Sequence, residues 1–168
     1  ANNSARLALT DQILTRSDKQ FRRIGGVPFE GLSQHIRFDA VGLRYGQDQP
    51  EALTQLSFNV SRGETLALVG PSGAGKSSIA DLLVGLYEPS EGQIWVDDQP
   101  LSALDLPSWQ QRLGVVSQDT FLFNASIAEN LSFGLEGVSQ AQLERAAAQA
   151  QAAGFIEALP EDYNTPVG

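Results

Sequence analysis

One stretch of this sequence combines glycines, a lysine and hydroxyl side chains at the spacing of a phosphate-binding loop. Residues 70–77 match the pattern G-x-x-x-x-G-K-[ST] in full. Glycines let successive backbone N–H groups point at phosphate oxygens, while Lys76 supplies a cation for the β- and γ-phosphates and the Ser77 hydroxyl suits Mg²⁺. The loop therefore predicts a site for a nucleoside triphosphate with Mg²⁺. Its candidate binding residues are Gly70, Ser72, Gly73, Ala74, Gly75, Lys76, Ser77 and Ser78.

The segments on either side of this loop have the patterns that such a loop needs. Residues 65–69 are apolar at nearly every position, which is typical of a central parallel strand covered on both faces. After the loop, apolar residues recur at helical spacing and predict a helix over about residues 76–85. A helix that begins there would direct the positive end of its dipole at bound phosphates. The apolar stripe of this helix is Ile79, Leu82, Leu83 and Leu86.

Further strands and helices are predicted around this unit. From His35 the apolar residues alternate and then change phase, which predicts one strand with a bulge near Ala40 or Gly42. Residues 56–60 predict a second, half-buried strand, so that the two form an outer antiparallel sheet. Strands are also expected at 93–96 and 113–116. Helices are expected to begin after Asp105 and at capping boxes starting at residues 126 and 139, the last running to about residue 158.

Composition limits the other possibilities. The 168 residues suffice for one globular domain, and the net charge of −9 argues against general nucleic-acid binding, because phosphate backbones would be repelled. The absence of cysteine excludes disulfides and thiolate chemistry. No apolar run approaches the ~20 residues that span a bilayer. The first residue is alanine rather than methionine, which suggests that the chain begins inside a longer polypeptide or that its start was processed.

Several motifs along the chain resemble those of ATP-binding cassette (ABC) proteins. Residues 70–78 look like the family's Walker A loop, and residues 38–45 resemble its first strand with the A-loop aromatic residue, here Tyr45, which stacks on adenine. Residues 115–124 resemble the Q-loop, whose glutamine, here Gln118, reaches Mg²⁺ and the γ-phosphate side. Residues 126–131 are similar to the stretch after the Q-loop in exporter-type members, and residues 164–168 resemble the opening of their X-loop.

The resemblance implies an α/β fold. It would contain a P-loop NTPase core with a parallel sheet, an N-terminal antiparallel β subdomain and a partial helical subdomain. Residues 1–34 would be an arm from a preceding transmembrane region, 35–117 the ATP-binding core, and 118–168 the Q-loop and part of the helical subdomain. The ligands would be ATP and Mg²⁺, with Ser77 and Gln118 on the metal.

The resemblance also implies partners and a location. In the intact parent, transmembrane domains and a second nucleotide-binding domain would be the partners, at the cytoplasmic face of a membrane, and ATP hydrolysis would power export. The family's signature motif, Walker B aspartate, catalytic glutamate and switch histidine would all follow the X-loop. No catalytic residue is therefore assigned, although Gln118 would assist on the Mg²⁺ and water side, and the 168 residues alone are expected not to turn over ATP.

Other interpretations stay open. Tyr45 could be a packed strand aromatic, Gln118 a solvated loop residue, and residues 121–123 either ordinary core or an apolar docking patch. Asp97 and Asp98 are expected in a turn, and His35 is assigned no role. The alternatives for the whole are a soluble ABC-type ATPase, a P-loop kinase or GTPase, and a non-catalytic nucleotide-binding or interaction fragment.

Overall fold

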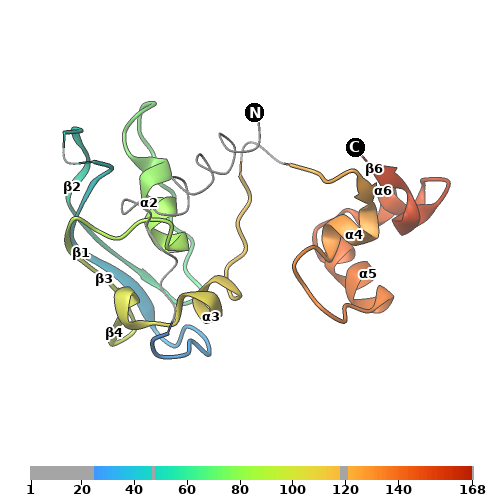
Figure 1. Ribbon diagram of the computed structural model, residues 1–168, viewed down its shortest axis with the longest axis horizontal. Helices are drawn as coiled ribbons and strands as arrows, with labels where there is room; N and C mark the ends of the chain where they lie inside the picture. Colours follow the sequence, from blue (N-terminus) through green and yellow to red (C-terminus); the bar gives the residue numbers. More distant parts are fainter. Residues whose placement is uncertain (1–24, 47, 118–120, 168) are drawn as a thin grey trace, which may run out of the picture. The chain divides into compact units, whose positions relative to one another are not determined.

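The first part of the chain builds a four-stranded sheet with the order β2-β1-β3-β4 (Figure 1). The computed structural model describes residues 25–46, 48–117 and 121–167. All neighbouring strands of this sheet are antiparallel, which confirms the predicted antiparallel sheet. The strands are β1 (His35–Arg44), β2 (Glu51–Ser61), β3 (Glu91–Val96) and β4 (Gln99–Pro100).

The predicted bulge in β1 is present at Ala40. Before it, Phe38 is opposite Phe58 on β2 and Ile94 on β3, and the register with both neighbours shifts after this point. Ala40 has a φ of 50°, and its N–H donates to Ser57 Oγ at 2.9 Å. The extra residue at the bulge moves the later side chains of β1 to the other face, which accounts for the change of phase in the sequence.

The predicted helix after the loop is confirmed as α2 (Lys76–Val84), which ends at Gly85 in a left-handed conformation with φ 77°. Glycine pays no Cβ penalty there, so it stops the helix cleanly. The buried face of α2 joins the side chains of the sheet and of the short helices η1 (Leu101–Ala103) and α3 (Leu106–Gln110) in one core. The core contains Phe38, Val41, Leu43, Leu53, Ile79, Leu82, Ile94, Val96, Leu101, Leu104, Leu106 and Trp109.

The prediction of a parallel sheet is wrong for the part of the chain that the structure describes. Residues 65–69 and 113–116 form no strand. Residues 65–69 and 114–116 are exposed rather than covered, up to 93% at Val69 and 97% at Val116, and only Leu113 is half-buried against the core. A strand exists only where its backbone hydrogen-bonds a neighbour, and no neighbour runs along either segment among the described residues. Both segments therefore have the apolar composition of central strands but lack backbone hydrogen bonds to a neighbouring strand among the described residues.

Residues 27–29 run along the start of α3. Val27 N–H donates to Ala103 O at 2.9 Å, and Val27 O accepts from Asp105 N at 2.8 Å. The ring of Phe29 meets the ring of Trp109 edge to face at 4.8 Å. The expected cap of this helix is confirmed, because the Asp105 side chain accepts from Ser108 N at 3.0 Å. Residues 1–24 lie outside the described residues.

Asp97 occupies the turn between β3 and β4, as expected, and also fastens the start of β1. Its carboxylate accepts from the backbone N–H groups of Ser33, Gln34 and His35 at 2.9, 2.6 and 3.0 Å. Burial acts to raise the pKa of Asp97, but these three hydrogen bonds outweigh it and hold the pKa below its ordinary value of 3.8. The charged form is therefore the one that stabilises the fold.

Replacing Asp97 with alanine is expected to lower the free energy of unfolding by about 1–2 kcal/mol at pH 7, because three N–H groups lose a charged acceptor. Since the folded-state pKa is depressed, this contribution is complete above the unfolded pKa and is lost as the pH falls below 3.8. Urea unfolding of wild type and variant at pH 7 and near pH 3 measures both effects. Equal stabilities at pH 7, or a difference that persists undiminished near pH 3, would contradict this account.

The second compact unit begins at Val115 and is mainly helical. It contains α4 (Ile127–Leu131), α5 (Gln140–Gln149), α6 (Ala153–Glu157), η2 (Asp162–Asn164) and the strand pair β5 (Ala125–Ser126) with β6 (Pro166–Val167). Both predicted capping boxes are present, at Ser126 with Glu129 and at Ser139 with Gln142. Its core contains Ile127, Leu143, Ala147, Ile156 and Tyr163.

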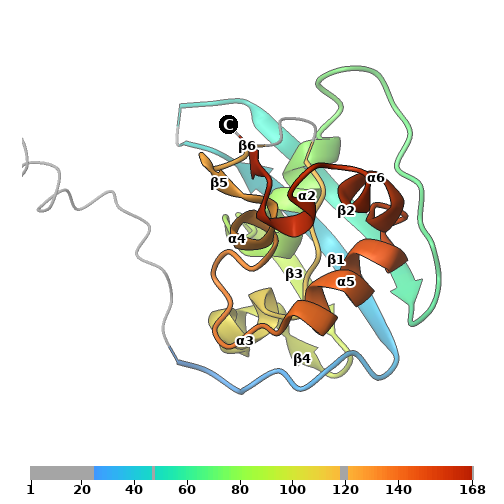
Figure 2. The same ribbon diagram turned by 90° about the vertical axis from the view of Figure 1, so that its right-hand side faces the viewer.

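The prediction of one helix reaching residue 158 is wrong, because α5 and α6 are separate helices (Figure 2). Gln151 between them has a φ of 58°, a left-handed conformation that ends the hydrogen-bond ladder. The sequence there, alanine and glutamine only, gives no sign of a break. Among the described helices, none combines the length and the apolar character needed to cross a membrane.

Candidate nucleotide-binding site

The predicted phosphate-binding loop connects residues 65–69 to α2, and two of its glycines have the left-handed conformation that such a loop needs. Gly73 and Gly75 lie in the left-handed region, with φ of 80° and 83°. Gly75 also lies against β2, where a Cβ would come within 2.7 Å of Ala52 O and of Leu53 Cδ2. Position 75 therefore excludes every other residue, for reasons of both conformation and space.

Two groups of the loop could hold a phosphate: the ammonium group of Lys76 and the N-terminus of α2. Lys76 Nζ donates to Gly70 O at 2.8 Å and to Pro71 O at 2.7 Å. The N-cap of α2, Gly75, offers no side-chain acceptor, whereas α3 and α4 are capped by Asp105 and Ser126. An uncapped helix N-terminus with a cation beside it is a site where an anion is stabilised by N–H groups, dipole and charge together.

Tyr45, just beyond the end of β1, lies against the start of α2. Its hydroxyl oxygen is 2.8 Å from Ser78 Oγ and 3.1 Å from Asp81 Oδ2. Its ring meets the Tyr87 ring edge to face at a centroid distance of 4.8 Å. Ser78 is 6% exposed, whereas Tyr45 keeps 39% of its surface exposed. The structure thus brings together two predicted binding residues that lie 33 positions apart.

The surroundings of Tyr45 raise the pKa of its phenol above the ordinary value of 10.0. The hydrogen bond with Ser78 acts to lower this pKa, but burial of the ring and the bond to the Asp81 carboxylate outweigh it. The phenol is consequently protonated throughout the neutral range, and its hydroxyl remains a hydrogen-bond donor.

The structure says less about the other predicted site residues. Ser72, Ala74 and Ser77 are exposed on the loop, and Gln118 lies outside the described residues. Within the described part of the chain, no three Asp, Glu, His or Cys side chains cluster as a metal site would require. Of the two residues predicted on Mg²⁺, the structure therefore places only Ser77.

Asp81 and Tyr87 were not among the predicted site residues. Ser78 and Asp81 are three positions apart on α2 and therefore share a face, so the sequence contained a signal for Asp81. No comparable pattern indicates Tyr87, which follows the end of the helix.

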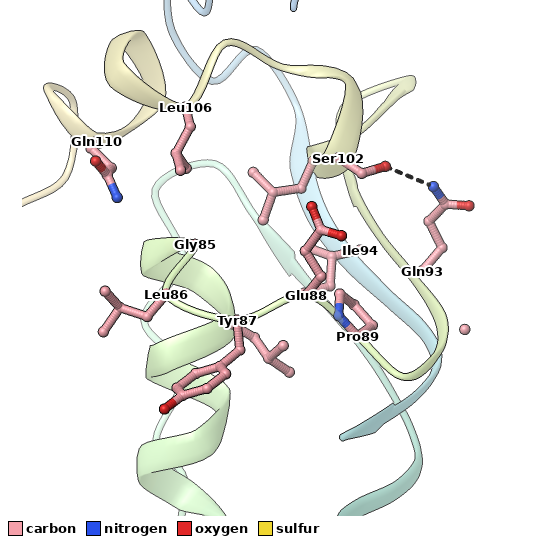
Figure 3. Close-up of a pocket in the computed structure, with 13 residues that line it drawn as sticks. Gly85, Leu86, Tyr87, Glu88, Pro89, Gln93, Ile94, Ser102, Leu106 and Gln110 are labelled. Atoms are coloured by element: carbon pink, nitrogen blue, oxygen red, sulfur yellow. Dashed lines mark hydrogen bonds between the residues drawn. The ribbon is translucent and has the colours of Figure 1, made fainter. Parts of the chain in front are cut away.

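A cavity of about 800 Å³ lies at the other end of α2 (Figure 3). Gly85 and Leu86 line it from the end of α2, Ile94 from β3, and Leu106 and Gln110 from α3. It contains none of the predicted binding residues, so the phosphate-binding loop and this cavity are separate features of the same unit.

Comparison with known proteins agrees with the motifs. Residues 53–165 match the ABC transporter family. The chain is 40% identical over 156 residues to the heterocyst differentiation ATP-binding protein HepA of Nostoc sp., covering 93% of this chain and 26% of that protein. It is 44% identical over 133 residues to an ATP-dependent lipid A-core flippase of Saccharophagus degradans, covering 79% and 22%.

A solved structure is similar over nearly the whole chain. It is that of a bacterial Atm1-family ABC exporter with ATP bound, with a TM-score of 0.86 and 37% identity, and it covers 98% of this chain and 29% of that one. The chain spans about a quarter of the length of these two curated relatives. With the family match across two thirds of its residues, the chain belongs to the ABC transporter family, as part of a nucleotide-binding domain of the exporter type.

Proposed function

We propose that this chain binds Mg-ATP as part of the ATPase domain of an exporter. The observation that carries the proposal is the loop at residues 70–78, where two left-handed glycines, an uncapped helix N-terminus and Lys76 converge. These groups fit a triphosphate, because each is a donor or a positive charge and none is an acceptor that would repel it.

The residues would act in distinct ways. Lys76 would exchange the carbonyls of Gly70 and Pro71 for phosphate oxygens, and Ser77 would offer its exposed hydroxyl to Mg²⁺. Tyr45, with part of its ring exposed, would stack on adenine. Gln118 would contact the metal and the γ-phosphate side. Bound Mg-ATP supplies the phosphoryl group whose transfer to water provides the energy for transport.

The second unit offers a surface suited to transmembrane partners. Phe121, Leu122 and Phe123 are exposed, Phe121 by 76%, and the Phe123 ring stacks on Phe133 at 4.2 Å. This arrangement favours the docking interpretation of residues 121–123 over the core interpretation. In the longer protein, we propose that this patch faces the transmembrane domains at the cytoplasmic side of a membrane, with a second nucleotide-binding domain completing the ATP site.

We further propose that the 168 residues alone do not hydrolyse ATP. The 168 residues do not contain the signature motif Leu-Ser-Gly-Gly-Gln. None of their acidic residues was assigned the role of the base that activates water. A phosphate-release assay on the purified chain, with Lys76→Ala as blank, is expected to show no difference between the two. Turnover that depends on Lys76 would refute the proposal of an inactive chain.

The binding proposal is tested by isothermal titration of the chain with nucleotides in the presence of Mg²⁺. Affinity is expected to fall in the order ATP, ADP, AMP, because each lost phosphate removes contacts with N–H groups and Lys76. The inference would be wrong if AMP bound as well as ATP, or if none of the three bound, since the loop would then not be the binding element.

A further inference from the structure

Asp81 is an acidic residue in a place where negative charge is unfavourable for the proposed ligand. It lies on the second turn of α2, one turn after the phosphate-binding loop, and the other residues of the loop and first turn carry no negative charge. Its carboxylate contacts the hydroxyl of Tyr45 at 3.1 Å. An acid so near a polyphosphate site weakens binding by repulsion, which raises the question of what else Asp81 does there.

The protons in this cluster can be assigned from chemistry. The Tyr45 hydroxyl has one hydrogen, and two oxygens lie at hydrogen-bond distance from it, on Ser78 and Asp81. The Asp81 carboxylate has no hydrogen to give, so the phenol donates to Asp81. Ser78 has a hydrogen of its own and donates it to the phenol oxygen. The Tyr45 hydroxyl is therefore held from both sides by residues of α2.

The Tyr87 ring supplies a third point of attachment. Its edge-to-face contact at 4.8 Å holds the side of the Tyr45 ring, while the two hydrogen bonds hold its tip. The residue as a whole keeps 39% of its surface exposed, so a ligand can reach it. The ring thus has a defined position with a free surface before any ligand arrives.

We propose that Asp81 is a positioning residue, which holds the ring of Tyr45 beside the phosphate-binding loop so that its free surface is ready to receive the nucleotide base. The inference rests on the proposed function. It extends that function by naming Asp81 as the residue that holds the base-binding side chain, Tyr45, in place. Ordering Tyr45 in advance removes the entropy cost of fixing that side chain when the nucleotide binds, which corresponds to about 3- to 10-fold in affinity.

The two effects of Asp81 have opposite signs, and this makes them separable. Removal of its charge should strengthen the binding of any polyphosphate, with or without a base. Removal of its hydrogen bond should weaken only ligands that carry a base, because only these use the Tyr45 ring. The ratio of the affinities for Mg-ATP and for Mg-tripolyphosphate cancels the first effect and isolates the second.

The experiment is the titration of the full chain with these two ligands, for wild type and five variants. The ratio is expected to fall about 3- to 10-fold in Asp81→Ala and in Tyr45→Phe, which keeps the ring but loses the hydroxyl. The double variant should fall no further, because both changes break the same bond. Asp81→Asn keeps an acceptor oxygen and should retain most of the ratio, and Asp98→Ala, an exposed acid in the turn after β3, should leave it unchanged.

Each outcome bears on the inference. A ratio in Asp81→Ala equal to that of wild type, or additive losses in the double variant, would overturn the role of Asp81 while leaving ATP binding intact. Failure of wild type to bind either ligand would overturn the proposed function itself, and the inference with it. The ring signals of ¹³C-labelled Tyr45 give a readout without nucleotide: they should move in Asp81→Ala and return in Asp81→Asn, and signals that do not move would count against the inference.

Discussion

Replacing Lys76 with alanine is expected to reduce the affinity for Mg-ATP at least about 100-fold, because two charge-assisted hydrogen bonds to phosphate are worth about 1.5–3 kcal/mol each. Within the described residues, the Nζ atom bonds only the exposed carbonyls of Gly70 and Pro71. Loss of these bonds costs the fold little, since water can take the place of the ammonium group. Calorimetric titration should therefore show lost binding while the urea midpoint stays nearly unchanged.

The chain provides its own control for this variant. Lys19 is the one other lysine in the sequence, so Lys19→Ala removes the same charge at another position. If bulk charge governed binding, the two substitutions would have similar effects. A loss of less than about threefold in Lys76→Ala would contradict the assignment of the loop.

Trp109→Ala is expected to produce the largest loss of stability, about 3–5 kcal/mol, which is the usual cost of removing a buried aromatic side chain. Trp109 is among the most deeply buried side chains of the first unit. Its indole Nε1 donates to Leu83 O at 2.7 Å, which joins α3 to the last turn of α2, and its ring contacts Phe29. Chemical denaturation followed by circular dichroism should show a lower midpoint.

Two phenylalanine substitutions separate packing from hydrogen bonding. Trp109→Phe keeps most of the apolar contact but leaves Leu83 O without its donor, and a loss of about 1–3 kcal/mol is expected. The indole nitrogen of Trp95 has no partner among the described residues, so Trp95→Phe removes a donor that was unsatisfied and should cost less. Equal losses in the two variants would argue against a role for the Trp109 hydrogen bond.

Features that depend on neighbouring residues could be predicted from the sequence. The helix after the loop, the capping boxes and the bulge at Ala40 all follow from spacing within about ten residues. The break at Gln151 is also local, but alanine and glutamine favour helix, so the sequence offered no warning.

Features that depend on distant pairing were harder to predict. The apolar composition of residues 65–69 predicted a covered central strand, and this was wrong, because composition alone cannot specify which strand lies beside a segment. Tyr45 was assigned to the site from its position in the motif order, whereas its contact with Asp81 joins residues 36 positions apart and became visible only in three dimensions. The roles of Gln118 and of Ser77 on the metal stay predictions.

The exposed residues 65–69 affect how the chain behaves in solution. No strand of the described residues pairs with the backbone of this segment, and its side chains are as exposed as Val69, so that another chain can add a strand there. If residues 65–69 of two copies paired, the contact would bury apolar side chains and give the backbone groups of both copies hydrogen-bond partners. Samples at high concentration are therefore expected to self-associate and then aggregate, and charged substitutions at Leu66 or Val69 should keep them in solution.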